Sequence, residues 1–172
     1  MAGGIQVGTT ASSPESIKLD KQVKEIAKSL IKKKSNKYTF STGHDKRKPI
    51  WPSVLTGCKP DGGLWFNENM EINAAFEAKH QNEKGNAIER HAKNLAVCIK
   101  HRAEDVKYVT FMTGAGSRPD GVLDRYARTM LYCHNAEDHQ EINVLHPRGL
   151  SFFLSEEGFT DEFIRSIMDQ AL

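Results

Sequence analysis

Two short strings near the middle of the chain carry acidic and basic residues at spacings that suit phosphodiester hydrolysis. Residues 59–63 have Asp61 at their centre, and residues 77–81 begin with Glu77 and contain Lys79. Hydrolysis places negative charge on the attacking water, the phosphoryl oxygens and the leaving oxygen, so the protein must supply cations. Mg²⁺ prefers oxygen ligands, commonly one or two carboxylates with waters and substrate phosphate, which suits Asp61 together with Glu77. The two strings therefore indicate a Mg²⁺ site.

These side chains can meet if the chain folds back between them. The apolar runs 64–66 and 72–76 are separated by polar residues 67–69, a pattern typical of two strands joined by a turn. Asp61 then enters the first strand of a hairpin. Glu77 and Lys79 end the second strand and share one face, because side chains alternate along a strand.

The hairpin reading gives each residue a role. Asp61 and Glu77 hold the metal, and the backbone carbonyl of Ala78 offers a further ligand. Lys79 orients or helps to deprotonate the attacking water. Catalytic function is thus expected at Asp61, Glu77 and Lys79, and metal ligation at Asp61, Glu77 and Ala78.

Parts of this pattern also occur elsewhere in the chain. Residues 105–107 read Asp-Val-Lys, and residues 119–121 repeat Pro-Asp-Gly. Neither has a complementary partner at hairpin distance, so we interpret them as a strand-edge charge pair and a turn. The basic runs 32–37 and 46–48 fit phosphate contact and solvated helix or loop ends equally well.

A third string, residues 85–90, precedes apolar residues with helical spacing. Ile88, Ala92, Leu95 and Ile99 predict a helix of about four turns, with polar residues off the apolar stripe. Those polar residues can face base edges, and the alternative is a polar helix start facing solvent.

Periodicity elsewhere predicts alternating helices and strands. Helices are expected over 19–31 and 122–131 and after Thr160, and strands over 106–113, 142–145 and 150–154. The order favours an α/β fold with a central mixed β-sheet flanked by helices. Residues 1–15 are expected as a flexible tail and residues 16–172 as one domain.

Composition limits the class of protein. The 172 residues are 38% hydrophobic and 27% charged, with a net charge of +2. We find no apolar run long enough for a membrane span and no signal-like N-terminus, so a cytoplasmic protein without a membrane partner is expected. Cys58, Cys98 and Cys133 suggest neither a disulfide framework nor a zinc site, and we expect small buried residues there.

The amino-acid sequences of the three strings are more specific than the spacing of their charged residues. They resemble the catalytic and recognition segments of the EcoRI/MunI-like type II restriction endonucleases of the PD-(D/E)XK nuclease superfamily. They read Lys59-Pro60-Asp61-Gly62-Gly63, Glu77-Ala78-Lys79-His80-Gln81 and Gly85-Asn86-Ala87-Ile88-Glu89-Arg90, followed by Lys93-Asn94. A fainter similarity continues through residues 108–111 and 123–125.

The resemblance implies a restriction-endonuclease-like core and a homodimer that cuts palindromic double-stranded DNA with Mg²⁺, leaving 5′ overhangs. It assigns the family's catalytic places to Asp61, Glu77 and Lys79. It also implies a prokaryotic cytoplasmic enzyme, with a cognate DNA methyltransferase as genetic partner.

In the family, the segment that matches residues 85–90 reads an inner AATT. By that similarity Asn86 contacts adenine, Arg90 bridges to bases and Glu89 holds Arg90 in register. Lys84 stands where the MunI branch carries Arg and can reach guanine, which favours AATT alone or inside a C·G pair. The other expected DNA contacts are Gly85, Ala87, Lys93, His80 and Gln81.

Two alternative functions remain open at this point. One is a structure-specific DNA repair or recombination nuclease of the same fold. The other is a DNA-binding module that is catalytically inactive. Intact Asp61, Glu77 and Lys79 argue against the inactive module, and the 85–90 segment argues against a nuclease without sequence preference.

Overall fold

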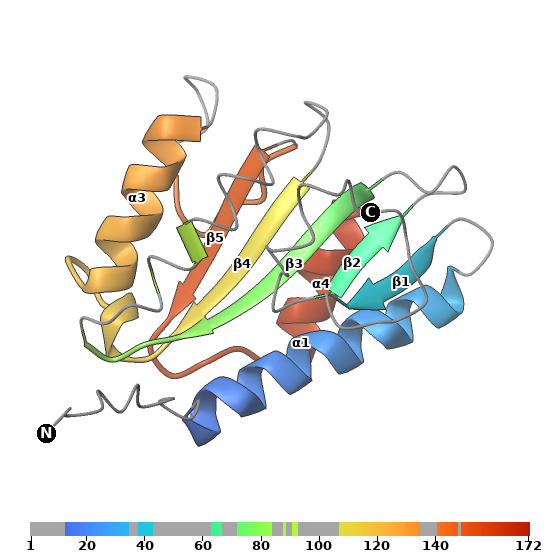
Figure 1. Cartoon of the computed structure of the whole chain (residues 1–172), viewed down its shortest axis with the longest axis horizontal. Helices are drawn as coiled ribbons and strands as arrows, with labels where there is room; N and C mark the ends of the chain where they lie inside the picture. The colour runs from blue at the N-terminus through green and yellow to red at the C-terminus, as the bar shows by residue number, and fades with distance from the viewer. Residues whose placement is uncertain are drawn as a thin grey trace, which may run out of the picture.

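The computed structural model of the chain describes residues 13–34, 38–42, 63–66, 72–83, 88, 91–92, 107–134, 141–147 and 149–172. These residues form a five-stranded sheet with helices packed against both faces (Figure 1). The chain is therefore α/β with a mixed sheet flanked by helices, as its periodicity predicts.

The strands lie in the sheet in their sequence order. They are β1 (Thr39–Thr42), β2 (Gly63–Phe66), β3 (Ile72–His80), β4 (Lys107–Thr113) and β5 (Gly149–Ser155). β1, β2 and β3 pair antiparallel, whereas β3, β4 and β5 pair parallel. Leu64 pairs with Ala75 and Phe66 with Ile72, which confirms the predicted hairpin.

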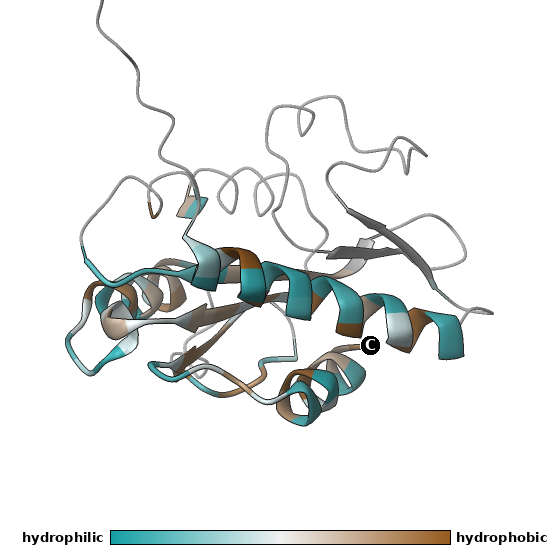
Figure 2. Cartoon of the chain, turned by 90° about the horizontal axis from the view of Figure 1, so that it is seen from below, coloured by the Kyte–Doolittle hydropathy of each residue, from teal (hydrophilic) through white to brown (hydrophobic). Residues whose placement is uncertain are grey.

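Two helices cover one face of the sheet. α1 (Pro14–Lys33) and α4 (Asp161–Ala171) bury their apolar stripes against even-numbered residues of β3 and odd-numbered residues of β4 and β5. Figure 2 shows apolar and polar bands alternating along α1, as expected for a helix with one face on a core. The sheet residues of this core are Ala74, Phe76, Ala78, Val109, Phe111 and Phe153.

Capping residues define where these two helices begin. The side chain of Ser13 accepts a hydrogen bond from the amide of Ser16, and Thr160 accepts one from Phe163. The predicted cap at Thr160 is confirmed, and Asp161 and Glu162 follow in the first turn, where the helix dipole favours acidic residues. α1 begins at Pro14, so residues 14 and 15 belong to the helix and not to the expected tail; residues 1–12 lie outside the described residues.

The opposite face of the sheet is covered by α3 (Val122–His134), which follows the short 3-10 turn η2 (Ala115–Ser117). Its apolar stripe packs on even-numbered residues of β4 and β5 and on Ala75 of β3. Ile88 packs against this second core as well. β4 is buried along almost its whole length because it lies between both helix layers, which explains its continuous apolar run.

The predicted strand over residues 142–145 is wrong. Residues 142 and 143 form a turn, and Asn143 has a positive φ of 61°, which Asn tolerates better than most residues. Its amide donates to the carbonyl of Phe152 at 2.8 Å, and its side-chain oxygen accepts from the amide of Leu154 at 2.8 Å. The backbone and side chain of Asn143 thus make the hydrogen bonds to β5 that a neighbouring strand would otherwise make.

The expectation of buried cysteines fails for Cys133, which is exposed near the end of α3. The buried stripe of that helix runs through Leu123, Ala127, Met130 and Leu131, and position 133 lies off it. Cys58 and Cys98 lie outside the described residues.

None of the helices described is both long enough and apolar enough to cross a membrane.

Candidate active site

Residues 77–80 of the second string form the end of β3. This strand pairs antiparallel with β2 and parallel with β4. Ala74, Phe76 and Ala78 face α1 and α4, whereas Ala75 faces α3. The strand alternation therefore puts Glu77 and Lys79 together on the α3 side of the sheet. This confirms that the two residues share one face.

Glu77 is held by a histidine that the catalytic strings do not include. Its Oε2 lies 3.0 Å from Nε2 of His91, and the two side chains are 13% and 2% exposed. Nδ1 of His91 lies 2.6 Å from the hydroxyl of Tyr126 on α3. The hydroxyl of Thr110, which pairs with Glu77 across β3 and β4, lies 3.4 Å from the same Nε2.

Donor and acceptor chemistry sets the direction of the contact between His91 and Glu77. An ionised carboxylate only accepts hydrogen bonds, so Nε2 of His91 donates to Glu77. Burial, and secondarily the negative charge of Glu77, raises the pKa of Tyr126, so its hydroxyl keeps its proton beside Nδ1 of His91.

Glu77 fits a Mg²⁺ ligand in its chemistry. Since His91 contacts Oε2, the other oxygen, Oε1, is the one left for a cation. Ligating carboxylates in metal sites are commonly hydrogen-bonded in this way by a residue that does not touch the metal. In the part of the chain that the structure describes, no group of three or more His, Cys, Asp or Glu residues gathers around a possible ion.

Asp61 lies outside the described residues, so its meeting with Glu77 stays a prediction. The strand that follows it, β2, begins two residues later at Gly63. The pairs between β2 and β3 run from Phe66 with Ile72 to Leu64 with Ala75, and Glu77 lies beyond them along β3. The antiparallel direction therefore points the start of β2 toward the half of β3 that carries Glu77.

His80 and Gln81 make contacts within the protein at the end of β3. Nδ1 of His80 lies 2.9 Å from the hydroxyl of Thr113. Because Phe76 and Ala78 both face α1, the strand alternation puts His80 on the α1 side as well, away from Glu77. Gln81 is 8% exposed, and its carbonyl accepts a hydrogen bond from the amide of Gly116 at 2.9 Å. Their DNA contacts stay predictions.

Most of the predicted recognition segment lies outside the described residues. This holds for Lys84, Gly85, Asn86, Ala87, Glu89, Arg90 and Lys93. Ile88, His91 and Ala92 are helical, in agreement with the predicted helix, and Ile88 and His91 lie on the α3 side of the sheet. These two described residues are therefore on the same side of the sheet as Glu77.

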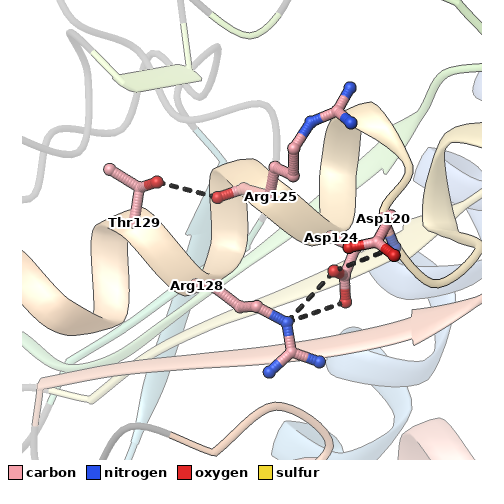
Figure 3. Close-up of polar contacts among 5 residues, drawn as sticks. All are labelled: Asp120, Asp124, Arg125, Arg128 and Thr129. Atoms are coloured by element: carbon pink, nitrogen blue, oxygen red, sulfur yellow. Dashed lines mark hydrogen bonds and ion pairs between the residues drawn. The ribbon is translucent and has the colours of Figure 1, made fainter.

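The first turn of α3 explains the repeated Pro-Asp-Gly string. Asp124 is buried, and it accepts hydrogen bonds from the amide of Asp120 at 3.3 Å and from Nε of Arg128 at 3.0 Å (Figure 3). Asp120 has a φ of 59° in the turn before the helix, which confirms the interpretation of this string as a turn. The exposed side chain of Arg125 points away from Asp124 in the same view.

The rival Asp-Val-Lys string is also accounted for. Lys107 starts β4, and its Nζ donates to the carbonyl of Ala171 at 2.8 Å, at the end of α4. A lysine at a helix C-terminus satisfies a carbonyl that has no partner within the helix. Lys107 therefore has a structural role, and Asp105 lies outside the described residues.

His91 and Tyr126 belong to the site but lie outside the motifs from which it was predicted. His91 occupies the face of the predicted helix that carries Ile88 and Ala92, three positions after Ile88. A polar residue on a buried stripe requires a hydrogen-bonding partner, so the place of His91 on this stripe is the signal by which it could have been found. The partners themselves come from β3 and α3 and can be found only in the fold.

Comparison of the chain with protein-family models, with curated proteins and with solved structures gives no match.

Proposed function

We propose that this protein is an EcoRI/MunI-like type II restriction endonuclease that cuts palindromic double-stranded DNA with Mg²⁺. The proposed product has 5′ overhangs, and the proposed recognition site contains AATT, alone or inside a C·G pair. The observation that carries the proposal is that Glu77 and Lys79 lie on the same face of β3 and that the buried imidazole of His91 donates a hydrogen bond to Glu77. The family resemblance of the three strings supports the same activity.

In this proposal each residue of the catalytic strings has a defined task. Bound Mg²⁺ would supply Lewis-acid stabilisation of the charge that develops on the phosphate. Glu77 and Asp61 would hold the ion, with the carbonyl of Ala78 as a further ligand. Lys79 would orient the attacking water and stabilise the developing negative charge from the same face as Glu77.

The proposed partners follow from the palindromic site. A homodimer places two equivalent centres on the two strands, because two-fold symmetric DNA suits a two-fold symmetric protein. A cognate DNA methyltransferase would protect the host genome, and we propose a prokaryotic cytoplasmic location for the pair. The parallel β3–β4–β5 sheet with α3 on one face leaves Glu77 on the side that also carries Ile88 and His91 of the recognition helix.

A digest of phage DNA by the purified chain tests the proposal. With Mg²⁺ we expect discrete fragments, and sequencing of their ends should give AATT at each cut; chelation of the metal should stop the reaction. A smear would instead support the repair or recombination nuclease. Intact DNA would overturn the nuclease function, and retained duplex binding would then support the inactive DNA-binding module.

The base-reading role proposed for Arg90 is tested by Arg90→Ala. A bidentate contact to a base contributes about 1–3 kcal/mol of discrimination, so cognate affinity should fall about 5- to 150-fold. Affinity for random DNA should change much less, because phosphate contacts remain. Competition binding with cognate and random duplexes measures both. An unchanged ratio between the two affinities would remove Arg90 from the recognition set.

A further inference from the structure

The buried imidazole of His91 joins three separate elements at the candidate site. His91 belongs to the helical residues after the 85–90 segment, Glu77 to β3 and Tyr126 to α3. The imidazole uses both nitrogens, Nε2 for Glu77 at 3.0 Å and Nδ1 for Tyr126 at 2.6 Å. Its ring also packs edge-on against the ring of Tyr126, with centroids 5.5 Å apart.

We infer that His91 is a positioning residue for Glu77: its imidazole, held in place by Tyr126, fixes the carboxylate for metal binding. This inference rests on the proposed function, because it takes Glu77 as a ligand of the catalytic metal. His91 itself does not touch the metal or the DNA in this account.

The contacts explain why an imidazole is suited to this place. A glutamate side chain has several rotatable bonds, and a metal ligand works best when its carboxylate is held in one orientation. The side chain of His91 is a rigid ring, and a second hydrogen bond, between Nδ1 and the hydroxyl of Tyr126, prevents that ring from turning. With only 2% of its side chain exposed, the donor to Glu77 is shielded from water.

His91→Leu and His91→Gln form the test pair. Leucine fills similar space without a donor, whereas the glutamine amide can still donate to Glu77. Titration of the full-length protein with Mn²⁺, followed by water-proton relaxation without DNA, should give an affinity about 10- to 100-fold weaker for His91→Leu. His91→Gln should recover most of the affinity. In cleavage assays the loss should fall on kcat, with the KM for DNA little changed.

A double-mutant comparison separates positioning from general destabilisation. If His91 acts through Glu77, adding His91→Leu to Glu77→Ala should weaken Mn²⁺ binding no further than Glu77→Ala alone. His146→Ala is the matched control, because His146 is as buried as His91, with 2% and 4% of the residues exposed, and its Nε2 contacts the carbonyl of Glu141 and not Glu77. It should leave the Mn²⁺ affinity unchanged.

The outcomes distinguish this inference from the proposed function. A wild-type protein that neither binds Mn²⁺ nor cuts DNA overturns both. If the wild-type protein binds Mn²⁺ and cuts DNA, two results overturn the role of His91 alone. One is a His91→Leu variant that keeps the wild-type Mn²⁺ affinity and kcat. The other is a His146→Ala variant whose losses equal those of His91→Leu. Should His91→Leu not fold, Tyr126→Phe carries the comparison, since it frees the imidazole without adding bulk; an unchanged affinity and kcat in that variant also overturns the role.

Discussion

Lys79→Ala is expected to lower the rate of Mg²⁺-dependent cleavage by about 10²–10³-fold or more, while affinity for duplex DNA stays nearly unchanged. The reason is that the ammonium group acts on charge that develops only in the transition state, so its loss removes little ground-state binding. Single-turnover cleavage of a short cognate duplex measures the rate, and binding in the absence of metal measures the affinity.

Lys107→Ala is the matched control for that experiment, because Lys107 ends the rival Asp-Val-Lys string. Its Nζ contacts the carbonyl of Ala171, so its removal should cost some stability at α4 and leave cleavage near the wild-type rate. Equal loss of cleavage in the two variants would count against Lys79 as the catalytic lysine. A fall in DNA affinity as large as the fall in rate would count against the metal site.

Phe111→Ala is expected to lower the free energy of unfolding by about 3–5 kcal/mol. Phe111 is 0% exposed on β4, the middle one of the three parallel strands, and its ring stacks on Phe153 with centroids 5.7 Å apart and meets Phe159 edge-on at 5.5 Å. The loss takes up much of the roughly 5–15 kcal/mol that stabilises an ordinary domain. Urea denaturation followed by circular dichroism measures it.

The same substitution bears on the candidate site, because Phe111 pairs with Ala78, the residue between Glu77 and Lys79. Loss of the ring should therefore loosen β3 and reduce cleavage at temperatures well below the unfolding midpoint. Tyr132→Ala serves as the control: Tyr132 is 74% exposed on α3, and its replacement should change stability by no more than about 0.5 kcal/mol. A cost for Phe111→Ala as small as that of Tyr132→Ala would contradict the packing described.

Several elements could be predicted from short-range pattern because their causes are local. The stripe of α1 follows from apolar residues at helical spacing, and the cap of α4 follows from Thr160. The β2–β3 hairpin follows from two apolar runs around a polar segment. The alternation of side chains along β3 then puts Glu77 and Lys79 on one face. Each of these features depends on residues within a few positions of one another.

The predictions that failed depended on what packs against a residue. Residues 142–145 are mostly apolar, as in a short strand, but the positive φ of Asn143 and its two hydrogen bonds to β5 make a turn there. Cys133 is small and apolar, yet the burial of α3 is decided by the sheet that it covers, and position 133 faces away from that sheet. Neither outcome has a local signal strong enough to predict it.

By itself the sequence determined the chemical groups and their places along the chain: a carboxylate and a lysine on one strand face, an aspartate ahead of the hairpin and a polar string at a helix start. Tertiary structure alone decided that Glu77, His91 and Tyr126 meet. Successive strands that pair parallel require crossover connections, and these connections bring the helical residues around His91 and helix α3 onto the same face of β3 and β4. Contacts between residues so distant in the chain depend on that packing, which no local pattern encodes.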